Sequence, residues 1–436
     1  MDIKAILQWT LIIFVIFVAI YLIINNTDLD SNPIKYSEFM INVPKVAHET
    51  ELKWSRAPSC KYKFDDTTSR VLEESNILNT DGHNAVIIFP CGYNNIDDEI
   101  KSLPSVYYKA SQELSELQKP TDVRIFIIDG ADEITAKNYL WKNIYGHHGM
   151  KKALDLSPNT YLLTGPQKEK DLNRLINEHT PGKMYILKKN VQRQTGLELT
   201  DSIDTIKQNN GGYVLAQELL ENSYLVNGRK INLRVYIIII CHKDNTDVYI
   251  FNNGFMYYTK QKFMKGSKER DNHITTGYVD RDVYDKNPLT HDDFKTYLDL
   301  SEGFKYHESN EPRTLYDNEK AIRDQGFKVS NIVFKRIEKM LADVFISFKG
   351  VICRKTDSKG DHIPIYDDYS VQIFGADVAI NDQLQPQIIE VNKGPDLSPK
   401  DDRDGRVKRK MFKDVLETIG VTNKSDDNGL ILILEM

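Results

Sequence analysis

Three oxygen-bearing side chains near the end of the sequence have the types and spacing of a site for a divalent cation. Glu390 and Asn392 are two residues apart at the end of an apolar run, so in a strand both point to the same face. Asp377 lies in the preceding apolar run. Carboxylate and amide oxygens are ligands that Mg²⁺ prefers, with nucleotide phosphates completing its coordination. The alternative interpretation is a strand whose polar face meets solvent.

The two apolar runs predict a β-hairpin. Residues 371–380 and 385–391 would form its strands, joined by a short turn. If the turn holds two or four residues, Asp377 lies opposite Ile388 and shares a face with Glu390. The hairpin would then bring the acidic side chains together among apolar neighbours, where polar groups are costly unless they are satisfied.

Basic side chains form a second candidate site. Lys188 ends the apolar run 184–188, and a strand-end lysine beside a loop can reach phosphates as a point charge. Lys230, Asn232 and Arg234 alternate along one face of a strand that leads into a run of isoleucines. This face predicts a pocket for several negative groups. The alternatives are a solvated strand-end lysine and an edge strand with a basic solvent face.

Alternating strand and helix signals predict a mixed α/β chain with two lobes. In the N-terminal lobe, residues 37–180, apolar runs at 85–90 and 123–129 flank a helix-like stretch at 105–117. The second region spans residues 181–425. Its predicted segments are strands at 184–188, 213–220, 231–241, 248–251 and 255–259, with Asn252-Asn253-Gly254 as the hairpin turn between the last two, and helices at 332–348 and 407–419.

The first residues predict a membrane anchor. The 20 residues Ala5–Ile24 carry no charge and would span roughly 30 Å as a helix, which is the thickness of the hydrocarbon core of a bilayer. We therefore expect residues 1–25 to be a single transmembrane helix and the polar residues 26–36 to be a tether. A cleaved signal peptide is the alternative, but the run is long for one. The flanking charges do not decide on which side of the membrane the residues after the anchor lie.

The composition is that of an ordinary folded protein. The 436 residues carry a net charge of −6, with 40% hydrophobic and 28% charged residues, which argues against a disordered chain and against a nucleic-acid partner. Asn423-Lys424-Ser425 is a sequon for N-glycosylation. The cysteines are widely separated and form no CxxC pair, so we expect neither a disulfide framework nor a zinc cluster from Cys60, Cys91, Cys241 and Cys353.

Five short motifs, taken in order, resemble those of the tubulin tyrosine ligase-like family. The similarity covers roughly residues 138–420. The motifs are Ile186-Leu187-Lys188-Lys189-Asn190, Ala216-Gln217-Glu218-Leu219-Leu220, Asn227-Gly228-Arg229-Lys230-Ile231-Asn232-Leu233-Arg234-Val235-Tyr236, Phe374-Gly375-Ala376-Asp377 and Ile389-Glu390-Val391-Asn392-Lys393-Gly394-Pro395.

The resemblance implies an ATP-grasp fold over residues 181–425 and an ATP- and Mg²⁺-dependent ligase. In this chemistry ATP converts a carboxylate into an acyl phosphate, which the amine of an amino acid then attacks. The roles that it implies for this chain are phosphate contacts by Lys188, an adenine hinge at Gln217, Glu218, Leu219 and Leu220, nucleotide contacts by Lys230 and Asn232, catalytic contacts by Arg234 and Lys230, and Mg²⁺ ligation by Asp377, Glu390 and Asn392.

Three positions depart from the family pattern. Asn232 replaces the usual Asp, Asn252 is aligned with a usual Arg, and Thr276 replaces a usual Asn. Because the metal set and the central cations are present, we expect an active, membrane-anchored ligase. The alternative is a non-catalytic ATP-grasp module that binds nucleotide or peptide and acts as a tether on a membrane.

The resemblance also implies a partner. Family acceptors are often acidic tails of tubulin, and we expect a tubulin-like acidic tail as acceptor with free glutamate as the favoured amino acid. A tubulin acceptor would place the catalytic region on the cytosolic side of the membrane.

Overall fold

The computed structural model describes residues 51–436, apart from residues 57–59, 61–63, 83, 93–99, 101–102, 104, 108, 111, 113–122, 192–195, 243–244 and 355–368. Within these residues, no helix combines the length and the apolar character needed to cross a membrane. The anchor and tether predicted at residues 1–36 lie outside the described residues, and the helix predicted at 105–117 lies partly outside them.

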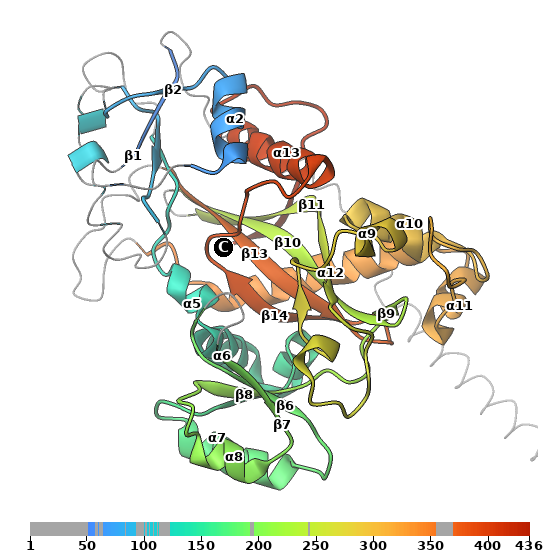
Figure 1. Ribbon diagram of the computed structural model, residues 1–436. Coiled ribbons are helices and arrows are strands. Elements are labelled where there is room, and N and C mark those ends of the chain that lie inside the picture. Colours follow the sequence, from blue (N-terminus) through green and yellow to red (C-terminus); the bar gives the residue numbers. More distant parts are fainter. Residues whose placement is uncertain are drawn as a thin grey trace, which may run out of the picture. The chain divides into compact units, whose positions relative to one another are not determined.

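A large mixed sheet runs through the described part of the chain (Figure 1). Its 11 described strands include β14 (Pro386–Asn392) beside β13, β15 (Leu430–Glu435) beside β11, and β9 (Leu225–Val226) beside β10. The main path follows β12 (Thr275–Thr276), β11 (Asn245–Thr259), β10 (Arg229–His242), β13 (Tyr369–Ile380), β4 (Arg124–Ile125), β3 (Ile87–Phe89), β1 (Lys53–Arg56) and β2 (Leu78–Asn79).

Parallel and antiparallel strands meet at β13. Strands β10, β11, β13 and β14 pair antiparallel, whereas β13 pairs parallel with β4, and the strands from β4 to β2 are parallel to one another. The isoleucines 237–240 of β10 and the whole of β13 are buried, as expected for strands covered on both faces. The mixed α/β class predicted from the sequence is confirmed.

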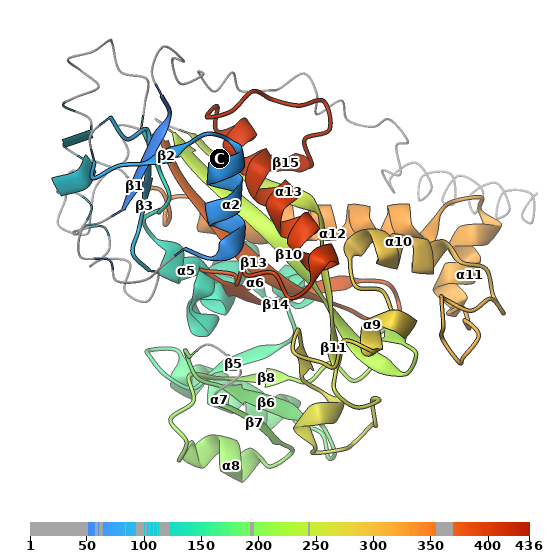
Figure 2. The same ribbon diagram turned by 45° about the horizontal axis from the view of Figure 1, so that its top comes forward.

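Helices cover the two faces of this sheet (Figures 1 and 2). On one face α12 (Val329–Phe345) packs on β11, β14 and β15, and the 3₁₀ helix η3 (Ile346–Phe348) extends it, which confirms the helix predicted at 332–348. On the other face α13 (Asp402–Thr418) packs on β11 and on α2 (Asp66–Glu74). The helix α13 begins before the predicted residue 407 because the Asp401 carboxylate accepts the Asp404 N–H and caps it.

Further helices in the described residues are α5 (Ala131–Thr135), α6 (Lys137–Leu156), η2 (Arg270–Asn272), α9 (Val283–Lys286), α10 (His291–Asp299) and α11 (Asp317–Asp324). Of these, α5 and α6 pack on β14, and α10 packs on β11 and α12.

A second, small sheet has its own apolar core. Its strands follow the order β5 (Thr160–Leu162), β8 (Leu215–Glu218), β6 (Tyr185–Lys188) and β7 (Leu197–Thr200), all antiparallel. The helices α7 (Lys168–Glu178) and α8 (Ile203–Gln208) supply Leu175 and Ile206 to this core. The sheet thus takes β5 from before residue 181 and its other strands from after it, while the predicted division into domains stays a prediction.

The hairpin predicted at Asn252-Asn253-Gly254 is wrong. These residues continue the single long strand β11, which pairs with β10 on both sides of a bulge between Val235 and Ile237. An Asn-Gly turn requires positive φ angles, and neither asparagine has one. Gly254 serves packing instead, because a Cβ there would lie 2.3 Å from the Arg234 carbonyl oxygen.

The predicted hairpin of β13 and β14 is present, but its register differs from the expectation. Residues 381–385 separate the strands, so the connection holds an odd number of residues. Val378 pairs with Ile388, and Ile389 is the extra residue of a β-bulge. As a result Asp377 lies directly opposite Glu390 rather than Ile388.

The expectation that the chain forms no disulfides is also wrong. Cys60 pairs with Cys91, and Cys241 pairs with Cys353, so all four cysteines are used. The partners are 31 and 112 residues apart in sequence. The pairs could not be recognised from the sequence because tertiary contacts bring the partners together, with Cα–Cα distances of 5.1 Å and 5.6 Å.

Candidate active site

A cavity of about 690 Å³ is lined by residues of both sheets. The small sheet contributes side chains from β6 and β8, and the large sheet contributes β10, β11, β13 and β14. Every site residue predicted from the sequence lines this cavity: Lys188, Gln217, Glu218, Leu219, Leu220, Lys230, Asn232, Arg234, Asp377, Glu390 and Asn392. The structure therefore brings the predicted set together, while the chemical role of each member stays a prediction.

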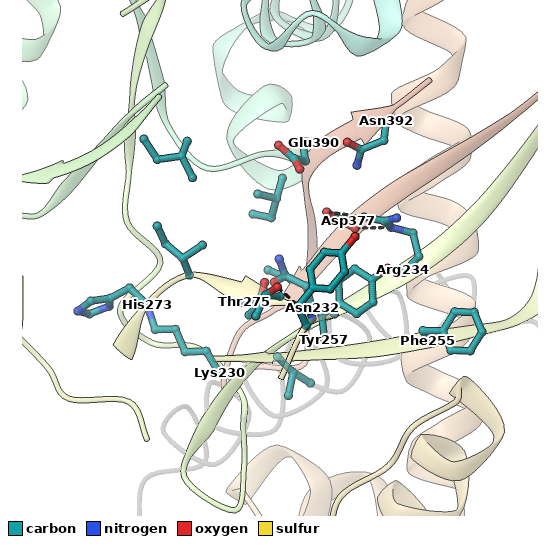
Figure 3. Close-up of a pocket in the computed structure, with 18 of the residues that line it drawn as sticks. Lys230, Asn232, Arg234, Phe255, Tyr257, His273, Thr275, Asp377, Glu390 and Asn392 are labelled. Atoms are coloured by element: carbon teal, nitrogen blue, oxygen red, sulfur yellow. Dashed lines mark hydrogen bonds and ion pairs between the residues drawn. The ribbon is translucent and has the colours of Figure 1, made fainter. Parts of the chain in front are cut away.

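Two acidic side chains share one wall of the cavity (Figure 3). Asp377 and Glu390 are cross-strand partners on β13 and β14. Burial raises the pKa of Asp377, and the neighbouring Glu390 adds to this effect despite the nearby Arg234. Burial also acts to raise the pKa of Glu390, but Lys137, Lys188 and Arg234 outweigh it and the pKa is lowered. A buried pair of like charges is stabilised by added positive charge.

Arg234 supplies part of that charge. Its Nε donates to Asp377 Oδ1 at 2.7 Å and its Nη2 donates to Asp377 Oδ2 at 3.1 Å, and these bonds are drawn in Figure 3. The geometry is the bidentate pairing that a planar guanidinium makes with a carboxylate. Because each carboxylate oxygen has two lone pairs, this pairing leaves Asp377 able to ligate a cation.

A lysine that sequence reasoning missed completes the acidic wall. Lys137 lies at the start of α6, and its Nζ is 3.5 Å from Glu390 Oε2 and donates to the Val191 carbonyl at 3.2 Å. No motif marks this residue, because it reaches the cavity only through the packing of α6 against β14.

The donor set fits Mg²⁺. It consists of two adjacent carboxylates and the side chain of Asn392, whose Nδ2 donates to the Gly375 carbonyl at 3.3 Å and so orients the amide. Hard oxygen ligands of this kind suit Mg²⁺, which keeps several positions for water and phosphate. Within the described residues, no group of three or more His, Cys, Asp or Glu side chains suggests another metal centre.

Buried hydrogen bonds connect Lys188 of β6 to β8 and β5 of the small sheet. Lys188 Nζ donates to Gln217 Oε1 at 2.7 Å, and Gln217 Nε2 donates to Thr160 Oγ1 at 2.9 Å. All three side chains are buried. Burial lowers the pKa of Lys188 to about 8, although Glu390 and Asp377 act in the opposite direction.

Lys230 approaches the backbone of Leu220 from β10. Its Nζ donates to the Leu220 carbonyl and lies 4.5 Å from the centre of the Phe263 ring. Burial lowers the pKa of Lys230 to about 8. His273 lies close to Lys230 in Figure 3, and its Nδ1 is buried without a partner in the cavity wall. Lys230 therefore lines the cavity while it is bonded to the Leu220 backbone.

One of the three departures from the family pattern lies away from the cavity. Asn252 belongs to the opposite side of β11, beside α10 and α12, and lines a different cavity. Two residues of β11 line the site instead, Phe255 and Tyr257, and Tyr257 is the cross-strand partner of Asn232. Its ring lies 4.8 Å from the Arg234 guanidinium. Thr276 and Asn232 do line the cavity.

The two lysines give nucleotide binding a pH dependence. Because both pKa values are about 8 rather than 10.5, each lysine loses its charge as the pH rises through 8. If ATP phosphates need these charges, as the resemblance implies, affinity should fall by up to about tenfold per lysine at pH 9. The lowered pKa values also reduce the free energy of unfolding below pH 8. Because the unfolded chain keeps these lysines protonated up to about pH 10.5, the free energy of unfolding should rise as the pH is raised from 8 to 10.5.

Calorimetric titration with ATP at pH 7, 8 and 9 measures this effect. Lys188→Met should weaken binding at pH 7 and reduce the pH dependence, whereas the exposed Lys349→Met should change neither. An affinity that stays constant from pH 7 to pH 9 would show that the lysine charges are not used.

Comparison with known proteins gives the site its context. The model of the "Tubulin-tyrosine ligase family" matches residues 115–428. The chain is 26% identical over 310 residues to a "Probable beta-tubulin polyglutamylase" of Tetrahymena thermophila, which covers 68% of this chain and 24% of the relative. It is 22% identical over 299 residues to the mouse (Mus musculus) "Tubulin monoglutamylase TTLL4", covering 67% and 23%.

A shorter match has a similar level of identity. The rat (Rattus norvegicus) "Probable tubulin polyglutamylase TTLL9" is 25% identical over 211 residues, covering 47% of this chain and 38% of the relative. The chain therefore spans about a quarter of the length of the first two relatives and just over a third of the third.

Proposed function

Because the chain belongs to the tubulin-tyrosine ligase family, we propose that it is an ATP-dependent ligase that joins glutamate to a carboxylate on an acidic protein tail. The observation that carries this proposal is the convergence of Asp377 and Glu390 with Lys188 and Lys230 in one cavity. Acidic ligands for a cation and buried positive charges for phosphates are the two parts that phosphoryl transfer from ATP requires.

The reaction has two steps. An acceptor carboxylate attacks the γ-phosphorus of ATP, which releases ADP and forms an acyl phosphate. The amine of the amino acid then attacks the acyl carbon, the C–O bond to phosphate breaks, and the amine loses a proton as the amide forms. Activation is needed because an unmodified carboxylate would have to expel oxide.

The residues of the chain supply position and charge. Lys188 and Lys230, held by Gln217 and the Leu220 carbonyl, would bind the phosphates of ATP. Mg²⁺ bound by Asp377, Glu390 and Asn392 would neutralise charge on the transferring phosphoryl group. Arg234 fixes Asp377 and presents its remaining N–H groups to the amino acid carboxylate.

The choice of glutamate and of an acidic acceptor follows the relatives. Their names describe glutamylation of tubulin, and membership of the same family supports the same reaction class for this chain. The acceptor tested first is therefore tubulin, together with a synthetic peptide rich in glutamate.

The decisive assay uses the full chain with ATP, Mg²⁺, radiolabelled glutamate and each acceptor. We expect incorporation into the acceptor that requires ATP and that Glu390→Gln removes. Glu302→Gln, an exposed substitution of the same type outside the cavity, should retain activity. Nucleotide binding without incorporation of any amino acid would support the alternative, a non-catalytic module that binds nucleotide or peptide.

A further inference from the structure

Both disulfides lie apart from the catalytic chemistry. None of the four cysteines lines the cavity that holds Asp377 and Glu390. The Cα–Cα distances of both pairs fall within the range that disulfides adopt. The backbone at both pairs is therefore placed for a disulfide, and neither pair belongs to the residues that line the cavity.

Each link ties down a different part of the large sheet. Cys60 and Cys91 follow β1 and β3, two parallel neighbours, and the pair closes a loop between them. Cys241 lies near the end of β10, the strand that carries Lys230 and Arg234, and joins the segment that follows η3. Cys241 is 1% exposed, and its partner Cys353 is partly buried against the same core.

Complete pairing of cysteines is informative about the compartment. Glutathione and thioredoxin keep structural thiols reduced in the cytosol, whereas disulfides form and persist in the secretory lumen and outside the cell. A chain whose four cysteines all pair, away from its catalytic site, matches the second environment.

Two further observations point the same way. Asn423 of the Asn423-Lys424-Ser425 sequon is exposed in the segment between α13 and β15, where a glycan would project into solvent. The sequence also begins with the uncharged run Ala5–Ile24, the kind of segment that directs a chain to a membrane and can carry the following residues across it.

We propose that the folded domain lies in an oxidising compartment, where both disulfides form and Asn423 carries an N-linked glycan. For the ligase, and resting on the proposed function, this means that the acceptor is an acidic protein of that compartment. Cytosolic tubulin is then excluded as the acceptor in the cell, even though its tail resembles the acceptor chemically. The oxidising compartment lies on the opposite side of the membrane from the cytosol, where a tubulin acceptor would require the domain to be.

To test this, the full chain is expressed in a eukaryotic cell and denatured. A maleimide reagent, which labels free thiols, is then used to count the unpaired cysteines. We expect no labelled cysteine before reduction and four after it. Asn423→Gln and Ser425→Ala should both remove one glycosidase-sensitive gel shift. Asn25→Gln, which alters the other sequon in the chain, is the matched control and should retain that shift.

The outcomes are distinct. Four free thiols before reduction would overturn the compartment assignment, and digestion of the domain by protease added to sealed microsomes would do the same. Absence of the gel shift would overturn the assignment of Asn423 as a glycan site. None of these results affects the purified ligase assay, which tests the proposed function separately.

Discussion

Replacing Glu390 with glutamine is expected to lower kcat for ligation by about 10³-fold. The substitution keeps the shape of the side chain but removes the charge that faces Lys137, Lys188 and Arg234 and that would hold Mg²⁺. An amide is a weaker ligand for a hard cation and leaves the cationic groups unbalanced. Steady-state kinetics with saturating ATP and glutamate measure the loss.

The control for this prediction separates chemistry from folding. The melting temperature of Glu390→Gln should lie within a few degrees of that of the unaltered chain. Glutamine has the shape of glutamate and forms hydrogen bonds, and the Glu390 side chain is 29% exposed, so that water can solvate the change. Glu302→Gln should retain full activity, since its carboxylate pairs with Lys320 at the surface. A Glu390→Gln variant with at least a tenth of the original kcat would remove this carboxylate from the catalytic set.

Replacing Arg234 with methionine is expected to lower the free energy of unfolding by about 3–5 kcal/mol, because it leaves the buried Asp377 carboxylate unpaired. The double variant Arg234→Met/Asp377→Leu removes the stranded charge as well and should recover part of the loss. Urea-induced unfolding of the two single variants and the double variant measures the coupling.

Comparing the double variant with the two single variants shows whether Arg234 and Asp377 stabilise each other. If the double variant is as unstable as the two single changes added together, the pair contributes no coupling and the crossing bonds between β10 and β13 are incidental. A clear recovery would show that Arg234 is there in part to allow Asp377 to remain charged before any cation binds.

The residues of the site could be predicted from the sequence because they sit at fixed offsets in short motifs. Glu390 and Asn392 share a face by the two-residue period of a strand, and Lys230 and Arg234 do so for the same reason. The resemblance carried by the five motifs in order implied that these residues form one site, which local periodicity alone does not indicate.

What depended on pairing between distant segments could not be predicted. Asn252-Asn253-Gly254 has the composition of a turn, but β10 offers a continuous partner and the chain stays extended. Lys137 carries no motif and reaches Glu390 only because α6 packs on β14. Cys241 and Cys353 meet for the same kind of reason, through tertiary contacts over 112 residues.

The bulge at Ile389 has a consequence for insertions and deletions in this segment. The odd connection at residues 381–385 alone would pair Asp377 with Ile389 and turn Glu390 to the opposite face of the sheet, and the extra residue in β14 restores the match. Gain or loss of one residue within the paired part of β13 or β14 would therefore turn one of the two carboxylates to the opposite face, whereas the connection itself can change length while the pairing of the strands is kept. Relatives that keep both carboxylates together are therefore expected to vary in length in the connection rather than in the strands.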